Sequence, residues 1–218
     1  TKIDNKIQLI QITDAKNKIS EDMNGQSIQF MNKNLFSNGW YIIEAKFIKN
    51  NSIDKDALYL KIENEPKNGL ISFLSSNHFN GIGNVQAEKL VTKYGFSFVK
   101  SLNDPVKKIV SNFELSESVA KSLIEGWNKT KEFNFLEIFL RDLKFKFSQI
   151  KTIKDTIGSS IISKLHKEPY GLMDIISRLS FDELTSILLK LGIVISDEQK
   201  ALAATNSWLK ETESRRQH

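Results

Sequence analysis

Cysteine is absent from this 218-residue chain, and histidine and proline occur only three times each. Without cysteine the chain can hold no disulfide framework, no cysteine-ligated zinc or iron–sulfur cluster and no thiol nucleophile. His78, His166 and His218 lie far apart in the sequence and form no spaced pair of metal ligands. No apolar run reaches the roughly 18 residues that a membrane span requires. We therefore expect neither a metal site nor a membrane partner.

The charge is unevenly distributed along the chain. Lysine and arginine number 31 and the acids number 26, which gives a formal net charge of +5 and a pI near 9.2. Residues 1–66 contain nine lysines and nine acids, so the whole excess lies in residues 67–218. A basic excess favours a polyanionic partner, but a general bias toward lysine and asparagine would produce the same balance.

The beginning of the chain carries no segment typical of export. No charged and then apolar signal peptide opens it, and the first residue is Thr1 rather than methionine. Hydrophobic residues make up 40% and charged residues 26%, which are ordinary values for a globular protein. We expect an intracellular protein, cytoplasmic or nucleoid-associated, and a piece of a longer chain.

The residues before Pro66 favour β-strands. The segments 40–48 and 57–62 are rich in aromatic and β-branched residues, and 50–54 between them is typical of a turn. Two further strands are predicted at 6–12 and 27–31. This set is enough for a small sheet and fits part of an OB-like barrel.

After Pro66 the apolar residues recur at helical spacing. A helix over 85–94 ends at Gly95, which is suited to a left-handed cap, and Asp104-Pro105 precedes the next helix. Ser116 or Ser118 can cap the helix that follows. The predicted helices from there on are 119–127, 135–143, 148–157, 159–167, 171–179, 181–191 and 197–209.

The most informative motif is the Gly-Ile-Gly turn at residues 81–83, which lies between two amphipathic segments. Gly81 and Gly83 permit positive φ angles and a close approach of the backbone to a ligand, and Ile82 can fill the groove between the helices. The first N–H groups of the second helix face outward at its positive end, which suits a phosphate. The pattern is that of a helix-hairpin-helix. An ordinary interhelical turn without nucleic acid is the alternative, and a dinucleotide fingerprint fails because Gln86 stands where its third glycine belongs.

A second, degenerate hairpin follows. Aligning Ala120 with Ala87 makes Glu114, Leu115 and Ser116 correspond to the Gly-Ile-Gly turn. Leu115 can still fill the groove between the helices and Ser116 can cap the second helix, but both glycines are lost. The acid at this position would repel phosphate. The candidate DNA-binding residues of the two hairpins are Gly81, Ile82, Gly83, Asn84, Gln86, Lys89, Lys93, Ser116, Ser118 and Lys121.

These patterns define an α+β fold class, with a small N-terminal β-domain followed by an all-α tandem helix-hairpin-helix array. We expect a β-rich domain at 1–65 and a tandem helix-hairpin-helix unit at 66–134. A second helical unit with degenerate hairpins follows at 135–212, and residues 213–218 form a tail.

The order of several short elements carries a family resemblance. The run 66–76 contains a proline and a Leu-Ser-Ser step, and it leads through the Gly-Ile-Gly turn to Tyr94-Gly95. Further elements are Trp127, the Glu-Pro-Tyr-Gly-Leu run 168–172, Phe181, the Leu-Gly-Ile run 191–193, Asp197 and Ala203. Over residues 66–209 the chain resembles the N-terminal region of RecD-like ATP-dependent DNA helicases.

The resemblance implies an accessory DNA-binding module and no enzyme activity of its own. The chain contains no Gly-x-x-x-x-Gly-Lys-Ser/Thr phosphate loop, so ATP and magnesium would belong to the motor domains of a parent protein. The implied partners are DNA, whether single-stranded, duplex or forked, and helicase motor domains in cis or in trans. The implied processes are DNA repair and recombination. The sequence departs from the family in its second and fourth hairpins, where Glu114, Ser116, Arg178 and Ser180 replace glycines.

Other candidate sites have simpler explanations. The acid pairs Asp182-Glu183 and Asp197-Glu198 stand where helix starts account for them. His78 next to the hairpin can touch a phosphate or lie at a helix end. Five phenylalanines between 133 and 147 can stack on bases, but their helical spacing favours a core, and Lys144 and Lys146 alternate with them as a basic strip. Two rival functions remain open, a DNA-junction-binding protein and a protein-interaction module that docks on motor domains.

Overall fold

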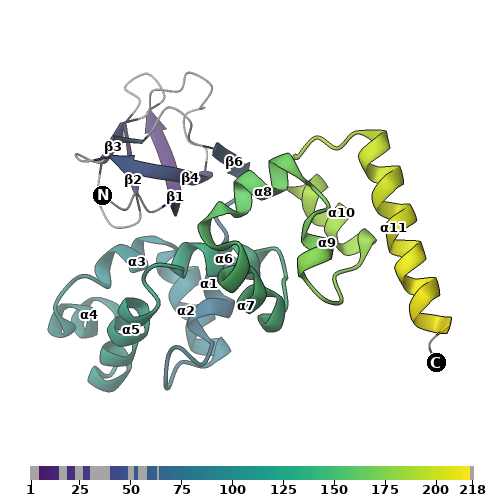
Figure 1. Ribbon diagram of the computed structural model, residues 1–218. Helices are drawn as coiled ribbons and strands as arrows, with labels where there is room; N and C mark the ends of the chain where they lie inside the picture. The colour runs from purple at the N-terminus through teal and green to yellow at the C-terminus, as the bar shows by residue number, and fades with distance from the viewer. Residues whose placement is uncertain are drawn as a thin grey trace.

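The computed structural model describes residues 5–14, 19–22, 27–29, 40–48, 52–53, 58–62 and 64–216. Strands occupy the N-terminal part and helices follow from residue 67 onward (Figure 1). The strands are β1 (Asn5–Asp14), β2 (Ile19–Asp22), β3 (Ser27–Gln29), β4 (Trp40–Ile48), β5 (Ser52–Ile53) and β6 (Leu58–Ile62). The α+β fold class predicted from the sequence is confirmed.

The strands close into a small barrel. β1 pairs antiparallel with both β2 and β4, β2 pairs with β3, and β3 pairs parallel with β5, which returns to β4. β6 continues along β4, with Trp40 opposite Ile62 and Glu44 opposite Leu58. This circuit is the strand order of an OB-fold barrel, with β5 and β6 as two parts of its last strand. Within the predicted turn 50–54, Ser52 and Ile53 join the sheet as β5, and the other three positions lie outside the described residues.

The helices form two units of the same design, each built from two helix pairs and a connecting helix. The first unit contains α1 (Lys67–Leu74), α2 (Asn84–Tyr94), α3 (Ser97–Ser101), α4 (Val106–Phe113) and α5 (Glu117–Lys129). The second contains α6 (Asn134–Asp142), α7 (Phe147–Thr156), the 3-10 turn η1 (Gly158–Ser160), α8 (Ile161–Lys167), α9 (Leu172–Ile175) and α10 (Phe181–Lys190). A last helix, α11 (Asp197–Arg216), follows.

Three helices differ from the prediction. The short helix α3 is not anticipated by the sequence pattern. α9 ends at Ile175 rather than Leu179, because Ile176 is already in an extended conformation, and the left-handed φ of 60° at Arg178 then turns the chain toward α10. α11 runs past Leu209 to Arg216, with charged residues on both of its end turns.

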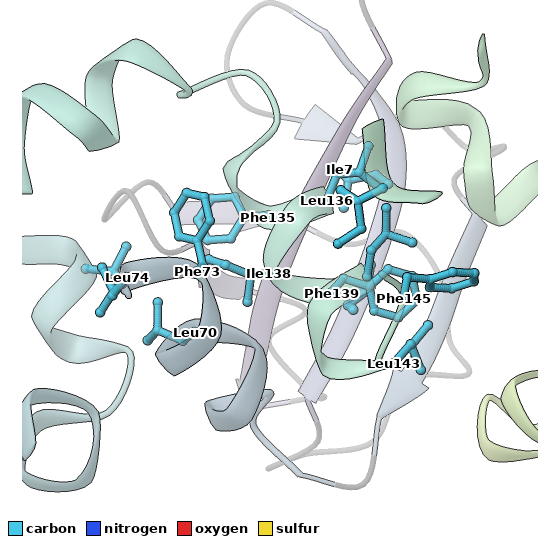
Figure 2. Close-up of a cluster of buried hydrophobic side chains, with 14 of the residues drawn as sticks. Ile7, Leu70, Phe73, Leu74, Phe135, Leu136, Ile138, Phe139, Leu143 and Phe145 are labelled. Atoms are coloured by element: carbon cyan, nitrogen blue, oxygen red, sulfur yellow. The ribbon is translucent and has the colours of Figure 1, made fainter. Parts of the chain in front are cut away.

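The helix α6 lies at the centre of the molecule and joins the two units to the barrel. Figure 2 shows Phe135 beside Phe73 of α1 and Leu136 beside Ile7 of β1. The backbone of α1 comes very close at Gly69, where an added Cβ atom would lie 2.1 Å from the carbonyl oxygen of Ile138. The Gly69 amide donates to Asp142 Oδ1 at 3.1 Å. A glycine is therefore required at this crossing of α1 and α6.

A buried ion cluster centred on Glu137 of α6 holds the same junction. Its side chain is only 2% exposed, and Oε1 accepts from Arg141 Nη2 at 2.8 Å while Oε2 accepts from Lys154 Nζ of α7 at 2.9 Å. His78 Nε2 lies 3.2 Å from Oε1. Arg141 also donates to the carbonyl oxygen of Ser72 on α1 at 3.2 Å. Burial raises the pKa of Glu137, but the hydrogen bonds from Lys154 and Arg141 outweigh it and leave the pKa below its usual value.

The barrel contacts the second unit through a second buried acid. Glu44 of β4 accepts a hydrogen bond from the amide of Ser163 on α8 at 2.8 Å, and the residue is 6% exposed. Burial raises the pKa of Glu44, which the backbone hydrogen bonds from Ser163 and Ile162 only partly oppose. Barrel and helices are thus joined by a polar contact as well as by the core.

Candidate nucleic-acid interface

Four turns between helices share one backbone pattern. Each contains a residue with positive φ, then a buried apolar residue, then the N-cap of the next helix. The positive-φ residues are Gly81 (78°), Glu114 (54°), Lys144 (66°) and Arg178 (60°). The buried residues that follow are Ile82, Leu115, Phe145 and Leu179, all less than 9% exposed. The caps are Gly83, Ser116, Lys146 and Ser180. The described part of the chain therefore contains four helix-hairpin-helix turns, two in each unit, which we number in chain order.

The N-terminal end of α2 in the first hairpin is open to solvent. Gly83 caps α2 in an extended conformation without a side-chain hydrogen bond, and a Cβ atom added there would meet nothing within 4 Å. Asn84 and Val85, the first two residues of α2, are exposed. The amides at this helix end point outward, and they carry the positive end of the helix dipole.

One face of α2 continues this surface along a groove. Gly83, Gln86, Lys89 and Lys93 line a groove of about 910 Å³ together with the acid Glu88, and its opposite wall is formed by residues 113–115 of the second hairpin. The structure thus brings four of the predicted site residues together. Ile82, at 4% exposure, is part of the hydrophobic core under the turn, and Asn84 is exposed at the start of the helix.

The two hairpins of the first unit are in contact. Val119 Cγ2 would lie 3.8 Å from a Cβ atom at Gly81, and Lys93 Nζ is 3.6 Å from Glu114 Oε1. A hydrogen bond with Tyr94 and the charge of Glu114 raise the pKa of Lys93, so this lysine is fully charged at neutral pH. Glu114 therefore competes with any phosphate for Lys93 at one end of the groove.

The second hairpin uses its polar groups internally. Ser116 Oγ accepts from the Val119 amide at 3.4 Å and lies 3.1 Å from Ser118 Oγ. Lys121 Nζ pairs with Glu117 Oε1 at 2.6 Å, and this hydrogen bond raises the pKa of the lysine. The three site residues predicted here lie on the first turns of α5 and do not line the groove of α2.

The third hairpin is one that sequence reasoning missed. Leu143 and Phe145 are buried at 7% exposure each, while Lys144 and Lys146 between and beside them are exposed. Because no glycine marks the turn, its only sequence signal is a short alternation of lysine with apolar residues between two helical segments. Lys144 adopts the left-handed conformation that Gly81 adopts in the first hairpin.

The fourth hairpin resembles the second. Ser180 Oγ accepts from the Glu183 amide at 3.2 Å, and Glu183 Oε2 accepts from the Ser180 amide at 3.0 Å. This capping box occupies the helix end and places an acid on it. The amide of Ser180 lowers the pKa of Glu183, which keeps the carboxylate ionised.

The other candidate residues named in the sequence analysis differ in burial and in contacts. Phe135, Phe139 and Phe145 are buried, as their spacing predicts, but Phe147 is 66% exposed. His78 is 26% exposed in its side chain and faces Glu137, which places it in the ion cluster. Among the described residues no group of three or more histidine, aspartate or glutamate side chains could hold a metal ion. None of the described helices is both long and apolar enough to cross a membrane.

The described residues thus combine an OB-like barrel with paired helix-hairpin-helix units. Residues 129–216, which include α6 to α11, match the family described as the ATP-dependent RecD2 DNA helicase HHH domain. The resemblance to the N-terminal region of RecD-like helicases is thereby confirmed. An HHH domain of this kind is non-catalytic in itself, and its match supports a role in DNA binding. We found no solved structure that matches the chain.

Proposed function

We propose that the chain binds the DNA backbone, largely without sequence preference, as an accessory module of a RecD-like DNA helicase. The single observation that carries this proposal is the first hairpin, where the open N-terminus of α2 continues into a groove lined by Lys89 and Lys93. Outward amides and lysines on one helix face are the groups that contact phosphate in DNA-binding proteins.

The proposal predicts binding that depends on salt and not on base sequence. Phosphate contacts position a protein on DNA but carry no sequence information. With about three or four phosphates neutralised, the logarithm of the association constant should fall against the logarithm of the salt concentration with a slope of roughly −3 to −4 on duplex DNA.

A second candidate is docking on motor domains, and α11 is the observation that favours it. Leu202 and Trp208 on this helix are 65% and 63% exposed, and the helix lies at the C-terminal end of the family match. Exposed apolar residues of this size are typical of contact surfaces. This role is compatible with DNA binding by the hairpins.

The test is a fluorescence-anisotropy titration of labelled single-stranded, duplex and forked DNA at two salt concentrations. Gly83→Glu places a carboxylate in open space at the helix end, so the variant should fold normally and bind at least about tenfold more weakly. Asn103→Glu adds the same charge at an exposed turn and serves as the matched control.

Each outcome has a definite meaning. Weakening by Gly83→Glu alone, with salt-dependent binding of the wild type, supports the proposal, and a preference for forks would favour the helicase role. Equal effects of the two variants would refute the hairpin as the contact. If the wild-type protein binds none of the three DNAs at low salt, the DNA-binding proposal is refuted and docking on motor domains becomes the favoured role. A strong preference for four-way junctions would favour a junction-binding protein.

A further inference from the structure

The last helix, α11, carries an exposed apolar strip. Figure 1 shows α11 at the edge of the molecule, beside α9 and α10. Ala203 is only 8% exposed, and Lys210 Nζ forms an ion pair with Asp174 Oδ1 of α9 at 2.7 Å, so these residues mark the side of α11 that faces the second unit. The large exposed side chains are Leu202, Trp208 and Leu209, at 65%, 63% and 44% exposure. With about 3.6 residues per turn, these three lie on one strip roughly 120° wide, turned away from the second unit.

The strip follows the alternating spacing of four and three residues that joins two paired helices. We call the positions with this spacing the α11 seam: Glu198, Leu202, Thr205, Leu209, Thr212 and Arg216. Both threonines donate their hydroxyls within the helix, Thr205 Oγ1 to the Ala201 carbonyl at 2.9 Å and Thr212 Oγ1 to the Leu209 carbonyl at 2.8 Å. Because these hydroxyls are already bonded, the whole middle of the seam can be covered without leaving a polar group unsatisfied.

The two ends of the seam carry opposite charges. Glu198 lies exposed in the first turn of α11, and Arg216 is its exposed last residue. Two copies of the seam that lie antiparallel would place Glu198 of each beside Arg216 of the other, so both ends would attract. A parallel pair would place like charges together at both ends. The charges therefore make the seam complementary to itself in the antiparallel orientation.

The same register also matches the residues between the ends. It pairs Glu198 with Arg216, Leu202 with Thr212, and Thr205 with Leu209. The symmetry axis of this arrangement passes at the level of Ser207. Trp208 is one residue from that level on the flank of the seam, so the two Trp208 side chains of a dimer would lie next to each other. Tryptophan is among the residue types that contribute most to binding at protein interfaces.

From these observations we infer that the α11 seam is a dimer interface, covered by the same helix of a second copy of this chain in antiparallel orientation. Docking on motor domains would use the same helix, but the acid at one end and the base at the other favour a second copy as its occupant. An interface one helix long is smaller than the standard size, so the dimer should be weak, with a dissociation constant on the order of 10 µM. The inference does not depend on DNA binding.

Sedimentation equilibrium of the whole chain without DNA tests the dimer. Between about 1 and 300 µM the mean mass should rise from 24.9 kDa toward twice that value. Leu202→Ala should weaken the dimer by about tenfold or more, because both copies lose a side chain from the seam. Leu189→Ala is the matched control, since Leu189 has the same 65% exposure but lies on α10, and it should leave the dimer unchanged.

Charge reversal tests the antiparallel register. Glu198→Arg or Arg216→Glu alone would place like charges together at both ends and should weaken the dimer by about tenfold at low salt. The double variant Glu198→Arg/Arg216→Glu restores opposite charges and should recover the dimer. It also keeps both unfavourable charges at the ends of the helix dipole, so a recovery cannot come from a more stable helix. Lys200→Glu reverses an exposed charge on α11 outside the seam and should have no effect.

The outcomes decide the inference without reference to the proposed function. A protein that stays monomeric at about 300 µM would refute the dimer and leave α11 free for docking on motor domains. A dimer that Leu202→Ala affects no more than Leu189→Ala would refute the seam as its interface. Single reversals that weaken the dimer without recovery in the double variant would refute the antiparallel register. A chain that dimerises as predicted but binds no DNA would refute the proposed function alone, and circular dichroism verifies that the variants are folded.

Discussion

Replacing Glu137 by glutamine should destabilise the protein strongly, although the two side chains have nearly the same shape. The carboxylate is 2% exposed and receives charged hydrogen bonds from Arg141 and Lys154 at 2.8 and 2.9 Å. The substitution leaves these two cations without their common counter-ion, and Arg141 is itself only 12% exposed. Removing one partner of a buried pair costs about 3–5 kcal/mol, and since glutamine keeps one acceptor we expect about 3 kcal/mol.

Urea unfolding followed by tryptophan fluorescence measures this effect, because Trp127 is buried beside the junction and its ring lies 5.8 Å from that of Phe135. With an m-value of about 2–3 kcal/mol/M, the midpoint should fall by about 1 M. Glu117→Gln breaks an exposed pair with Lys121 and should leave the midpoint unchanged.

The pH dependence gives a second check on the same residue. Because the folded-state pKa of Glu137 is lowered, its stabilisation is present above the pKa of the unfolded chain and is lost as the pH falls through the folded-state pKa. The stability difference between wild type and Glu137→Gln should therefore narrow in acid. A midpoint shift as small as that of Glu117→Gln would refute the view that this cluster holds the two units together.

Three further predictions concern two packing contacts and one buried carboxylate. Gly69→Ala should destabilise by at least about 1–3 kcal/mol, because its Cβ atom would lie 2.1 Å from the Ile138 carbonyl, and thermal unfolding measures this. Phe145→Ala, which removes the buried plug of the third hairpin, should cost about 3–5 kcal/mol in urea unfolding, and a loss below about 1 kcal/mol would contradict its place in the core. Glu44→Gln should have an effect opposite in sign to Glu137→Gln. The raised pKa of Glu44 means that its ionised form weakens the fold as the pH rises, so the variant should be as stable as wild type or more stable at neutral pH, with the gap closing in acid.

Local sequence patterns were sufficient where glycine or serine marks a turn. The first hairpin is visible in the sequence because Gly81 needs a positive φ and no other residue type signals that as clearly. The cap at Ser116 is likewise found from its position before an apolar helix. The α+β class follows from the change of period near Pro66.

Features that depend on tertiary context were not predictable from the same patterns. Lys144 adopts the left-handed conformation although lysine rarely does, so the sequence shows a break between the predicted helices 135–143 and 148–157 but no glycine that marks it as a hairpin. Phe147 has the spacing of a core residue, but it is the first residue of α7 and its side chain is 66% exposed. The closure of the barrel depends on the pairing of β1 with β4, which lies far along the chain.

The central claim is that the open N-terminal end of α2 in the first hairpin contacts DNA, and backbone amide signals in an NMR titration test it most directly. On addition of forked DNA, the amides of Asn84, Val85 and Gln86 should shift first and most. The N-terminal ends of α5 and α10 provide the internal reference, because Ser116 and Ser180 already accept hydrogen bonds from the Val119 and Glu183 amides there. Large shifts at α2 and small ones at α5 and α10 are the predicted result. Equal shifts at all three ends, or shifts confined to α11, would contradict the account.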